Sequence, residues 1–83
     1  MYEVQIERTA QKQLQKIPAP HFNRIIKAIY ALGANPRPHG FKKLSGRDGY
    51  RIRIGDYRVI YLIEDAVLKV FVIEIGHRKE IYD

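Results

Sequence analysis

The strongest signal for the fold is the run Tyr50-Arg51-Ile52-Arg53-Ile54-Gly55-Asp56-Tyr57-Arg58-Val59-Ile60-Tyr61. Apolar and charged residues alternate on both sides of Gly55-Asp56, a two-residue signal for a tight turn between antiparallel strands. Such a turn fixes the register of the hairpin. It predicts four facing pairs, namely Ile54 with Tyr57, Arg53 with Arg58, Ile52 with Val59, and Tyr50 with Tyr61.

Successive side chains of a strand point to opposite faces, so this register gives the hairpin an apolar face and a basic face. The predicted core side holds Tyr50, Ile52, Ile54, Tyr57, Val59 and Tyr61. Arg51, Arg53 and Arg58 point together to the other side, although facing like charges cost a few tenths to about 1 kcal/mol. A bound phosphate explains the arrangement, because planar guanidinium groups match phosphate oxygens. The alternative is that solvent and nearby acidic side chains neutralise the arginines.

The residues before the hairpin predict one strand and two helices. Alternation over Tyr2 to Glu7 indicates a half-buried strand. Thr9 is the expected N-cap of a helix that continues to about Ile17, before two prolines interrupt it. From Pro20 to Leu32, apolar residues recur every three or four positions, which predicts a second helix.

The residues after the hairpin predict a second turn near Asp65 and a strand from Val67 to Ile75. Strict alternation in this strand predicts one face with Leu68, Val70 and Val72, and another with Val67, Phe71, Ile73 and Ile75. Apolar residues on both faces indicate a central strand. The expected fold is α+β, in the order β-α-α-β-β-β, with an antiparallel sheet and two N-terminal helices packed on one face. The other face is then free for function.

Length and composition limit what this chain can be. Its 83 residues predict a single domain over 1–83, with 46% hydrophobic residues for a core and a net charge of +6 that favours polyanionic partners. The alternative is that this charge only serves solubility. The absence of cysteine excludes disulfides and thiolate sites, and three separated histidines predict no metal or cofactor. Without a signal-peptide pattern or a membrane-spanning apolar run, we expect a cytoplasmic protein.

Three segments in order resemble the RelE branch of the RelE/ParE toxin superfamily. They are Lys43-Leu44-Ser45-Gly46, the hairpin of residues 50–61, and Gly76-His77-Arg78-Lys79-Glu80-Ile81-Tyr82. The resemblance covers essentially the whole chain and implies a RelE/ParE-like, microbial RNase-like fold. It implies the toxin of a type II toxin–antitoxin system, a metal-independent mRNA interferase. Such a toxin cleaves mRNA in the decoding site of the ribosome by attack of a ribose 2′-hydroxyl on the adjacent phosphate.

The resemblance also implies which partners and residues matter. A RelB-like antitoxin is expected to neutralise the toxin, and DNA is contacted only through their complex. The ribosome and mRNA are the other partners, and no membrane is involved. The implied catalytic residues are Arg51, Arg53, Arg58, Arg78 and Tyr82. The expected RNA-binding residues are Lys42, Lys43 and Arg47.

The residue that accepts the proton in the family's cleavage mechanism cannot be assigned to this chain by resemblance. The best-known members carry lysines where this chain has Arg51 and Arg53, and arginine does not deprotonate in proteins. No Asp or Glu is expected among the arginines. His77 is therefore the candidate for proton transfer, a common role of imidazole near neutral pH.

Two other functions fit the same fold. A ParE-like DNA gyrase inhibitor would act through a protein target without nuclease chemistry. A catalytically inactive homologue would keep the basic face only to bind RNA or its antitoxin. The arginines of the hairpin and the His77-Arg78 ending favour the nuclease.

Overall fold

The computed structural model describes residues 1–79. Its elements are β1 (Glu3–Ile6), α1 (Arg8–Gln15), α2 (His21–Ala31), β2 (Lys42–Lys43), β3 (Tyr50–Ile54), β4 (Tyr57–Glu64), the 3-10 helix η1 (Asp65–Val67) and β5 (Lys69–His77). The predicted α+β order is confirmed, with the short strand β2 added before the hairpin. No helix within the described range is long and apolar enough to cross a membrane.

The strands form one five-stranded sheet in the order β1-β5-β4-β3-β2. The three pairs from β2 to β5 are antiparallel, whereas β1 pairs with β5 in parallel. The expected antiparallel sheet is therefore confirmed from β3 to β5 and is wrong for the pairing of β1. After the meander of β3, β4 and β5, the last strand runs in the direction of the first, and the two lie side by side. The same pairing confirms that β5 has a strand on each side.

The hairpin adopts the predicted register. Ile54 pairs with Tyr57, Arg53 with Arg58, Ile52 with Val59, and Tyr50 with Tyr61. Gly55 has a φ of 60°, a conformation that a residue without Cβ adopts at no steric cost. The turn therefore forms where the sequence predicted it.

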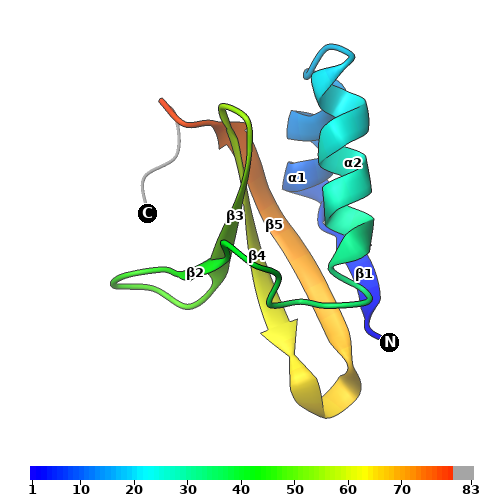
Figure 1. Ribbon diagram of the computed structural model, residues 1–83, viewed down its shortest axis with the longest axis vertical. Helices are drawn as coiled ribbons and strands as arrows, with labels where there is room; N and C mark the ends of the chain where they lie inside the picture. The colour runs from blue at the N-terminus through cyan, green and yellow to red at the C-terminus, as the bar shows by residue number, and fades with distance from the viewer. Residues whose placement is uncertain (80–83) are drawn as a thin grey trace.

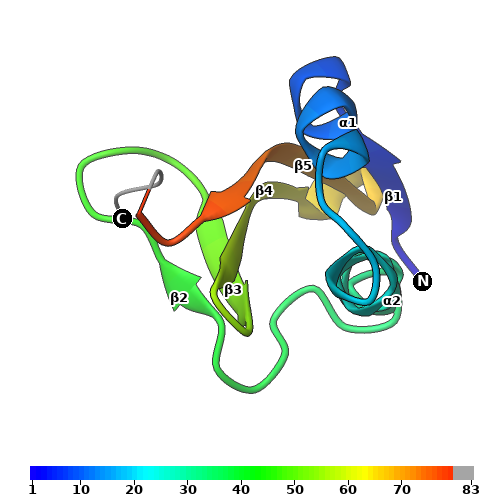
Figure 2. The ribbon, with the colours of Figure 1, turned by 90° about the horizontal axis from the view of Figure 1, so that it is seen from above.

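Both helices cover the same face of the sheet (Figure 1), and α1 lies beside β5 (Figure 2). The helices bury Ala10, Leu14, Ile25, Ile29 and Leu32 against Ile52, Val59, Tyr61, Val70, Val72 and Ile75. The prediction that Thr9 caps the first helix is wrong. The Glu7 N–H donates to the Val72 carbonyl, which keeps the chain extended there, so Glu7 is the N-cap and Arg8 begins the helix.

A β-bulge in β5 changes which of its residues face the helices. Ile60 pairs with Glu74 and Tyr61 with Val72, so Ile73 is an extra residue on β5. The prediction that Ile75 shares a face with Phe71 and Ile73 is wrong. Ile75 lies in the main core, while Ile73 packs on the opposite face. Strict alternation fails because it assumes an uninterrupted pairing.

The sheet face opposite the helices is partly covered. Leu44 and Ile60 are buried there, and Ile73 packs against them. β2 and the loop after it extend to the side of the sheet away from the helices (Figure 1). The prediction that this face is free is therefore wrong at its centre, because the loop brings Leu44 onto the strands. The same face carries the arginines, with Arg51 beside Ile60 and with Arg53 and Arg58 nearer the Gly55 turn.

Candidate nucleic-acid interface

Three arginines of the hairpin share the sheet face that lies opposite the helices. Arg53 and Arg58 pair directly across β3 and β4, and Arg51 pairs with Ile60 two residues further from the turn. Their neighbours Ile52 and Val59 lie in the helix-side core. We call the surface formed by Arg51, Arg53 and Arg58 the arginine face. Strand alternation placed these cations together, as the sequence predicted.

The three arginines differ in exposure. Arg51 is only 4% exposed, Arg58 is half-buried, and Arg53 is exposed. Burial restricts the rotamers of a long side chain, so Arg51 and Arg58 are held more firmly than Arg53. The arginine face therefore combines two ordered guanidinium groups with one that is open to an incoming ligand.

Arg78 is tied to the turn of the same hairpin. Its backbone N–H donates to the carbonyl oxygen of Asp56 at 2.8 Å, and its Nε lies 3.7 Å from the Asp56 Oδ1. Both side chains are more than half exposed, so the ion pair itself contributes little stability. The backbone hydrogen bond holds the chain at Arg78 beside the turn that follows Arg53 and precedes Arg58, and the ion pair directs the Arg78 side chain toward that turn.

His77 lies on the other side of the sheet. It pairs with Tyr57, and their rings meet edge to face with centroids 5.6 Å apart. His21 contacts the same tyrosine at 5.5 Å. The His77 Nδ1 accepts a hydrogen bond from the Lys79 N–H at 3.3 Å. The structure thus does not bring His77 together with the arginines, and Tyr82 lies outside the described residues.

The three expected RNA-binding residues are not in one place. Lys42 pairs with Arg51 and shares its face, whereas its neighbour Lys43 pairs with Tyr50 and points to the other side. Both lysines are exposed. Arg47 lies in the loop between β2 and β3, with its Nη1 3.8 Å from Oε1 of Glu74. Lys42 and Arg47 therefore border the arginine face, and Lys43 does not.

One carboxylate lies on the arginine face and a second lies at the turn next to it, although no carboxylate was expected among the arginines. Asp56 contacts Arg78 at the turn. Glu74 pairs with Ile60, whose other neighbour across the sheet is Arg51. The bulge puts Glu74 on this face, and nothing in the local sequence predicts a bulge. The contact between Asp56 and Arg78 links the hairpin turn to the end of β5. The sequence gives one indication of it, which is the position of Asp56 in the predicted Gly55-Asp56 turn.

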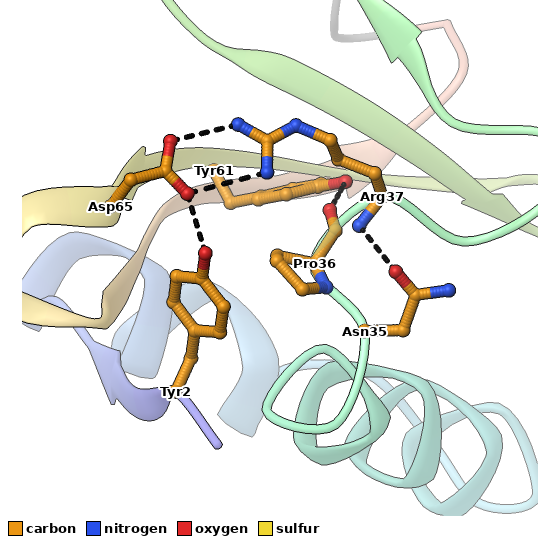
Figure 3. A network of polar contacts seen from close by, with 6 residues as sticks. All are labelled: Tyr2, Asn35, Pro36, Arg37, Tyr61 and Asp65. Atoms are coloured by element: carbon orange, nitrogen blue, oxygen red, sulfur yellow. Dashed lines mark hydrogen bonds and ion pairs between the residues drawn. The ribbon is translucent and has the colours of Figure 1, made fainter.

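The opposite end of the sheet carries a network of matched charges (Figure 3). The Arg37 guanidinium makes two hydrogen bonds to the Asp65 carboxylate, at 2.9 and 3.3 Å. The hydroxyl of Tyr2 donates to the same carboxylate, and Arg37 also lies over the ring of Tyr50 at 5.9 Å. This network joins the chain start, the loop after α2 and the β4–β5 turn.

The network shifts the pKa values of its members. Hydrogen bonds from Arg37 and Tyr2 lower the pKa of Asp65, and Asp65 in turn raises the pKa of Tyr2. Burial raises the pKa of Tyr61 to about 12, and its hydroxyl donates to the Pro36 carbonyl at 2.7 Å. All of these interactions join residues that are far apart in the chain, so this end of the sheet is suited to stability.

Comparison with known proteins extends this picture. Residues 4–82 match the family model described as the ParE toxin of type II toxin-antitoxin system, parDE. Toxin RelE of Mycobacterium tuberculosis is 32% identical over 83 residues, which is 98% of this chain and 86% of that protein.

Solved structures of RelE toxins have the same fold. The archaeal RelE-RelB complex from Pyrococcus horikoshii gives a TM-score of 0.83 at 31% identity, covering 96% of this chain and 98% of that one. The intact E. coli RelBE toxin-antitoxin complex gives 0.80 at 28% identity, covering 93% and 96%. The family model carries the ParE description, while these relatives are RelE toxins. The chain belongs to the RelE/ParE toxin superfamily, in its RelE branch.

Proposed function

We propose that this type II toxin is a ribosome-dependent, metal-independent endoribonuclease that cleaves mRNA in the decoding site and so stops translation and growth. The observation that carries the proposal is the arginine face, with Arg78 tethered beside it by Asp56. A net charge of +6 on a small protein also favours association with RNA. Its target would place the toxin in the cytoplasm.

The proposed chemistry is attack of a ribose 2′-oxygen on the neighbouring phosphorus, with loss of the 5′-oxygen. Negative charge develops on the phosphate during this step, and preorganised guanidinium groups stabilise it. Arg51 and Arg53 would contact the phosphate and the leaving group, and Arg58 and Arg78 would hold the transition-state charge. Tyr82 would stack on a base or take up a proton.

Lys42 and Arg47 border this face and would hold the RNA on either side of the cut. Lys43 would contact RNA only beyond the arginine face, because it points away from Lys42. The placement of His77 against Tyr57 favours a packing role over proton transfer.

The proposed partner is a RelB-like antitoxin. The relatives from Pyrococcus horikoshii and E. coli were solved as complexes of RelE with RelB. An acidic segment would complement the basic surface of this chain, and its binding would neutralise the toxin. Contacts with DNA would come from the antitoxin within that complex.

In vitro translation with purified protein, followed by primer extension on the mRNA, tests this function. The parent, Arg78→Ala and a reaction without ribosomes should be compared. We expect cuts only when both ribosomes and Arg78 are present. Intact mRNA with the parent protein would exclude the nuclease.

The ParE description of the family model favours one second candidate, inhibition of DNA gyrase. That activity requires a protein target and does not use the arginine face to bind a phosphate. A gyrase cleavage-complex assay on the same preparation separates the two functions. Trapped gyrase complexes together with intact mRNA would show that the protein inhibits gyrase and is not a nuclease.

A further inference from the structure

Glu74 stands in line with the arginine face. The pairings place Lys42, Arg51, Ile60 and Glu74 in one row across four strands. In the adjacent row, Arg53 pairs with Arg58, and Arg58 pairs with Gly76. Glu74 and Arg58 are thus diagonal neighbours on adjacent strands, a separation of about 7–8 Å that long side chains can span.

The bulge is what brings Glu74 to this face. Val70 and Val72 point into the helix-side core, and uninterrupted alternation would send residue 74 the same way. With Ile73 as the extra residue, Ile73 and Glu74 both oppose Ile60, and Ile75 takes the core position. Bulges commonly redirect a side chain next to an active site.

The surroundings of Glu74 keep it in place but accessible. Its side chain is 33% exposed, and Arg47 approaches it at 3.8 Å from the loop above. Its pairing partner Ile60 and its chain neighbour Ile73 belong to the small apolar cluster that also contains Leu44. The charged groups that face it are Arg47 from the loop, Arg51 from β3 and Arg58 from β4.

We propose that Glu74 is the proton acceptor for the 2′-hydroxyl, an inference that rests on the proposed nuclease function. The Glu74 carboxylate takes the proton as the 2′-oxygen forms its bond to phosphorus. The bond from phosphorus to the 5′-oxygen breaks, and the leaving oxygen keeps the electron pair and takes a proton from water. The products are a 2′,3′-cyclic phosphate and a free 5′-hydroxyl.

The other candidates among residues 1–79 are less suitable. Arginine does not accept a proton in proteins, and His77 packs on the far side of the sheet. Asp56 lies in the β3–β4 turn, outside the paired rows that carry Arg51, Arg53 and Arg58, and its side chain is 63% exposed. Glu74 is the carboxylate among these residues that the backbone directs toward the arginine face.

Charge and chemistry predict opposite effects for removal of this carboxylate. Loss of a negative charge from a basic face should tighten RNA binding. Loss of a general base should slow cleavage, typically by 100- to 10,000-fold. Replacement of a residue with only a structural or electrostatic role would not both tighten RNA binding and slow cleavage.

The test is single-turnover cleavage of mRNA on programmed ribosomes by the parent, Glu74→Gln, Glu74→Ala and Asp48→Asn. Asp48 is an exposed loop carboxylate, so its variant controls for the change in net charge. We expect Glu74→Gln to cleave at least about 100-fold more slowly at saturating protein, with an unchanged or lower half-saturating concentration. Asp48→Asn should cleave at the parent rate. Formate should restore cleavage to Glu74→Ala and not to Arg78→Ala.

Two results would overturn the assignment while leaving the nuclease intact. One is Glu74→Gln cleaving at the parental rate. The other is that Glu74→Ala cleaves slowly and is not rescued by formate, while Arg47→Gln cleaves equally slowly. Glu74 would then act only by holding Arg47 in place. Unfolding of either Glu74 variant is checked by circular dichroism, and Glu74→Asp offers a conservative second measurement. Absence of cleavage by the parent is a different result, which removes the proposed function itself.

Discussion

The two ends of the sheet use arginine in opposite ways. At the end with the β4–β5 turn, Arg37 meets Asp65 through two hydrogen bonds, and the hydroxyl of Tyr2 completes the site. At the end with the β3–β4 turn, Arg53 and Arg58 face one another across the hairpin. One end matches opposite charges, and the other gathers like charges.

The difference separates stability from function. A matched pair joins elements that are far apart in the chain, and it has no charge left for a ligand. Facing arginines destabilise a hairpin slightly, so a fold keeps them where a bound anion compensates. We therefore expect substitutions at one end to alter unfolding and those at the other to alter cleavage.

The largest effect is expected from Arg58→Ala, compared with Arg37→Ala. Removal of one preorganised charge-stabilising group typically lowers a rate by about 100- to 1,000-fold, so Arg58→Ala should nearly abolish cleavage on ribosomes. Arg37→Ala should cleave at the parental rate and unfold at a lower temperature, because it loses the contacts to Asp65. Cleavage rates and thermal midpoints of both variants check this. Equal losses of activity in the two would contradict the division between the ends.

A smaller effect is expected when Arg78 loses its tether. Asp56→Ala removes the contact to Nε but leaves the backbone hydrogen bond, so we expect cleavage to slow by about tenfold. Asp56→Asn retains an oxygen acceptor and should fall between this variant and the parent. Single-turnover rates at saturating protein measure the effect. A faster Asp56→Ala would indicate that the carboxylate merely offsets the basic charge.

Tyr61→Phe tests the matched end without changing a charge. It removes the hydrogen bond to the Pro36 carbonyl, which should lower the free energy of unfolding by about 1 kcal/mol. For a domain of this size, that corresponds to a fall of about 4–8 °C in the thermal midpoint. Scanning calorimetry measures the shift, and cleavage by the folded variant should be unchanged.

Tyr61→Phe also tests whether titration of Tyr61 contributes to the loss of stability at alkaline pH. Burial raises the folded-state pKa of Tyr61 to about 12, above its ordinary value of 10.0. The stability from this group is present below pH 10 and is lost as the pH rises toward 12. The parent should therefore lose stability faster than Tyr61→Phe over this range. Parallel denaturation curves from pH 10 to 12 would show that Tyr61 does not titrate as described.

The smallest effect is expected from Asp65 at acid pH. Its folded-state pKa is lowered, chiefly by the hydrogen bonds from Arg37, so its contribution is present above its ordinary value of 3.8. That contribution is lost as the pH falls through the folded-state pKa. Thermal midpoints between pH 5 and 2 should converge for the parent and Asp65→Asn. A constant difference between the two thermal midpoints over this range would show that the stability contributed by Asp65 does not depend on pH.

The sequence alone determined the hairpin and its arginine face. Alternation with a period of two and a Gly-Asp turn are local signals, and together they fix the register of residues 50–61. Apolar spacing likewise located both helices and the long last strand, because those patterns repeat within a few residues. Each of the three segments that resemble RelE toxins is also a continuous run of residues.

Three features follow from the packing of the whole chain: the parallel pairing of β1 with β5, the bulge that turns Glu74 to the arginine face, and the side of the sheet on which His77 lies. The contact of Arg78 with Asp56 and that of Tyr2 with Asp65 join residues 22 and 63 positions apart. Such contacts depend on how separate elements pack, and no short-range pattern encodes that packing. Local sequence patterns therefore predict where the arginines of the arginine face lie, whereas the positions of the Asp56 and Glu74 carboxylates depend on the assembled sheet.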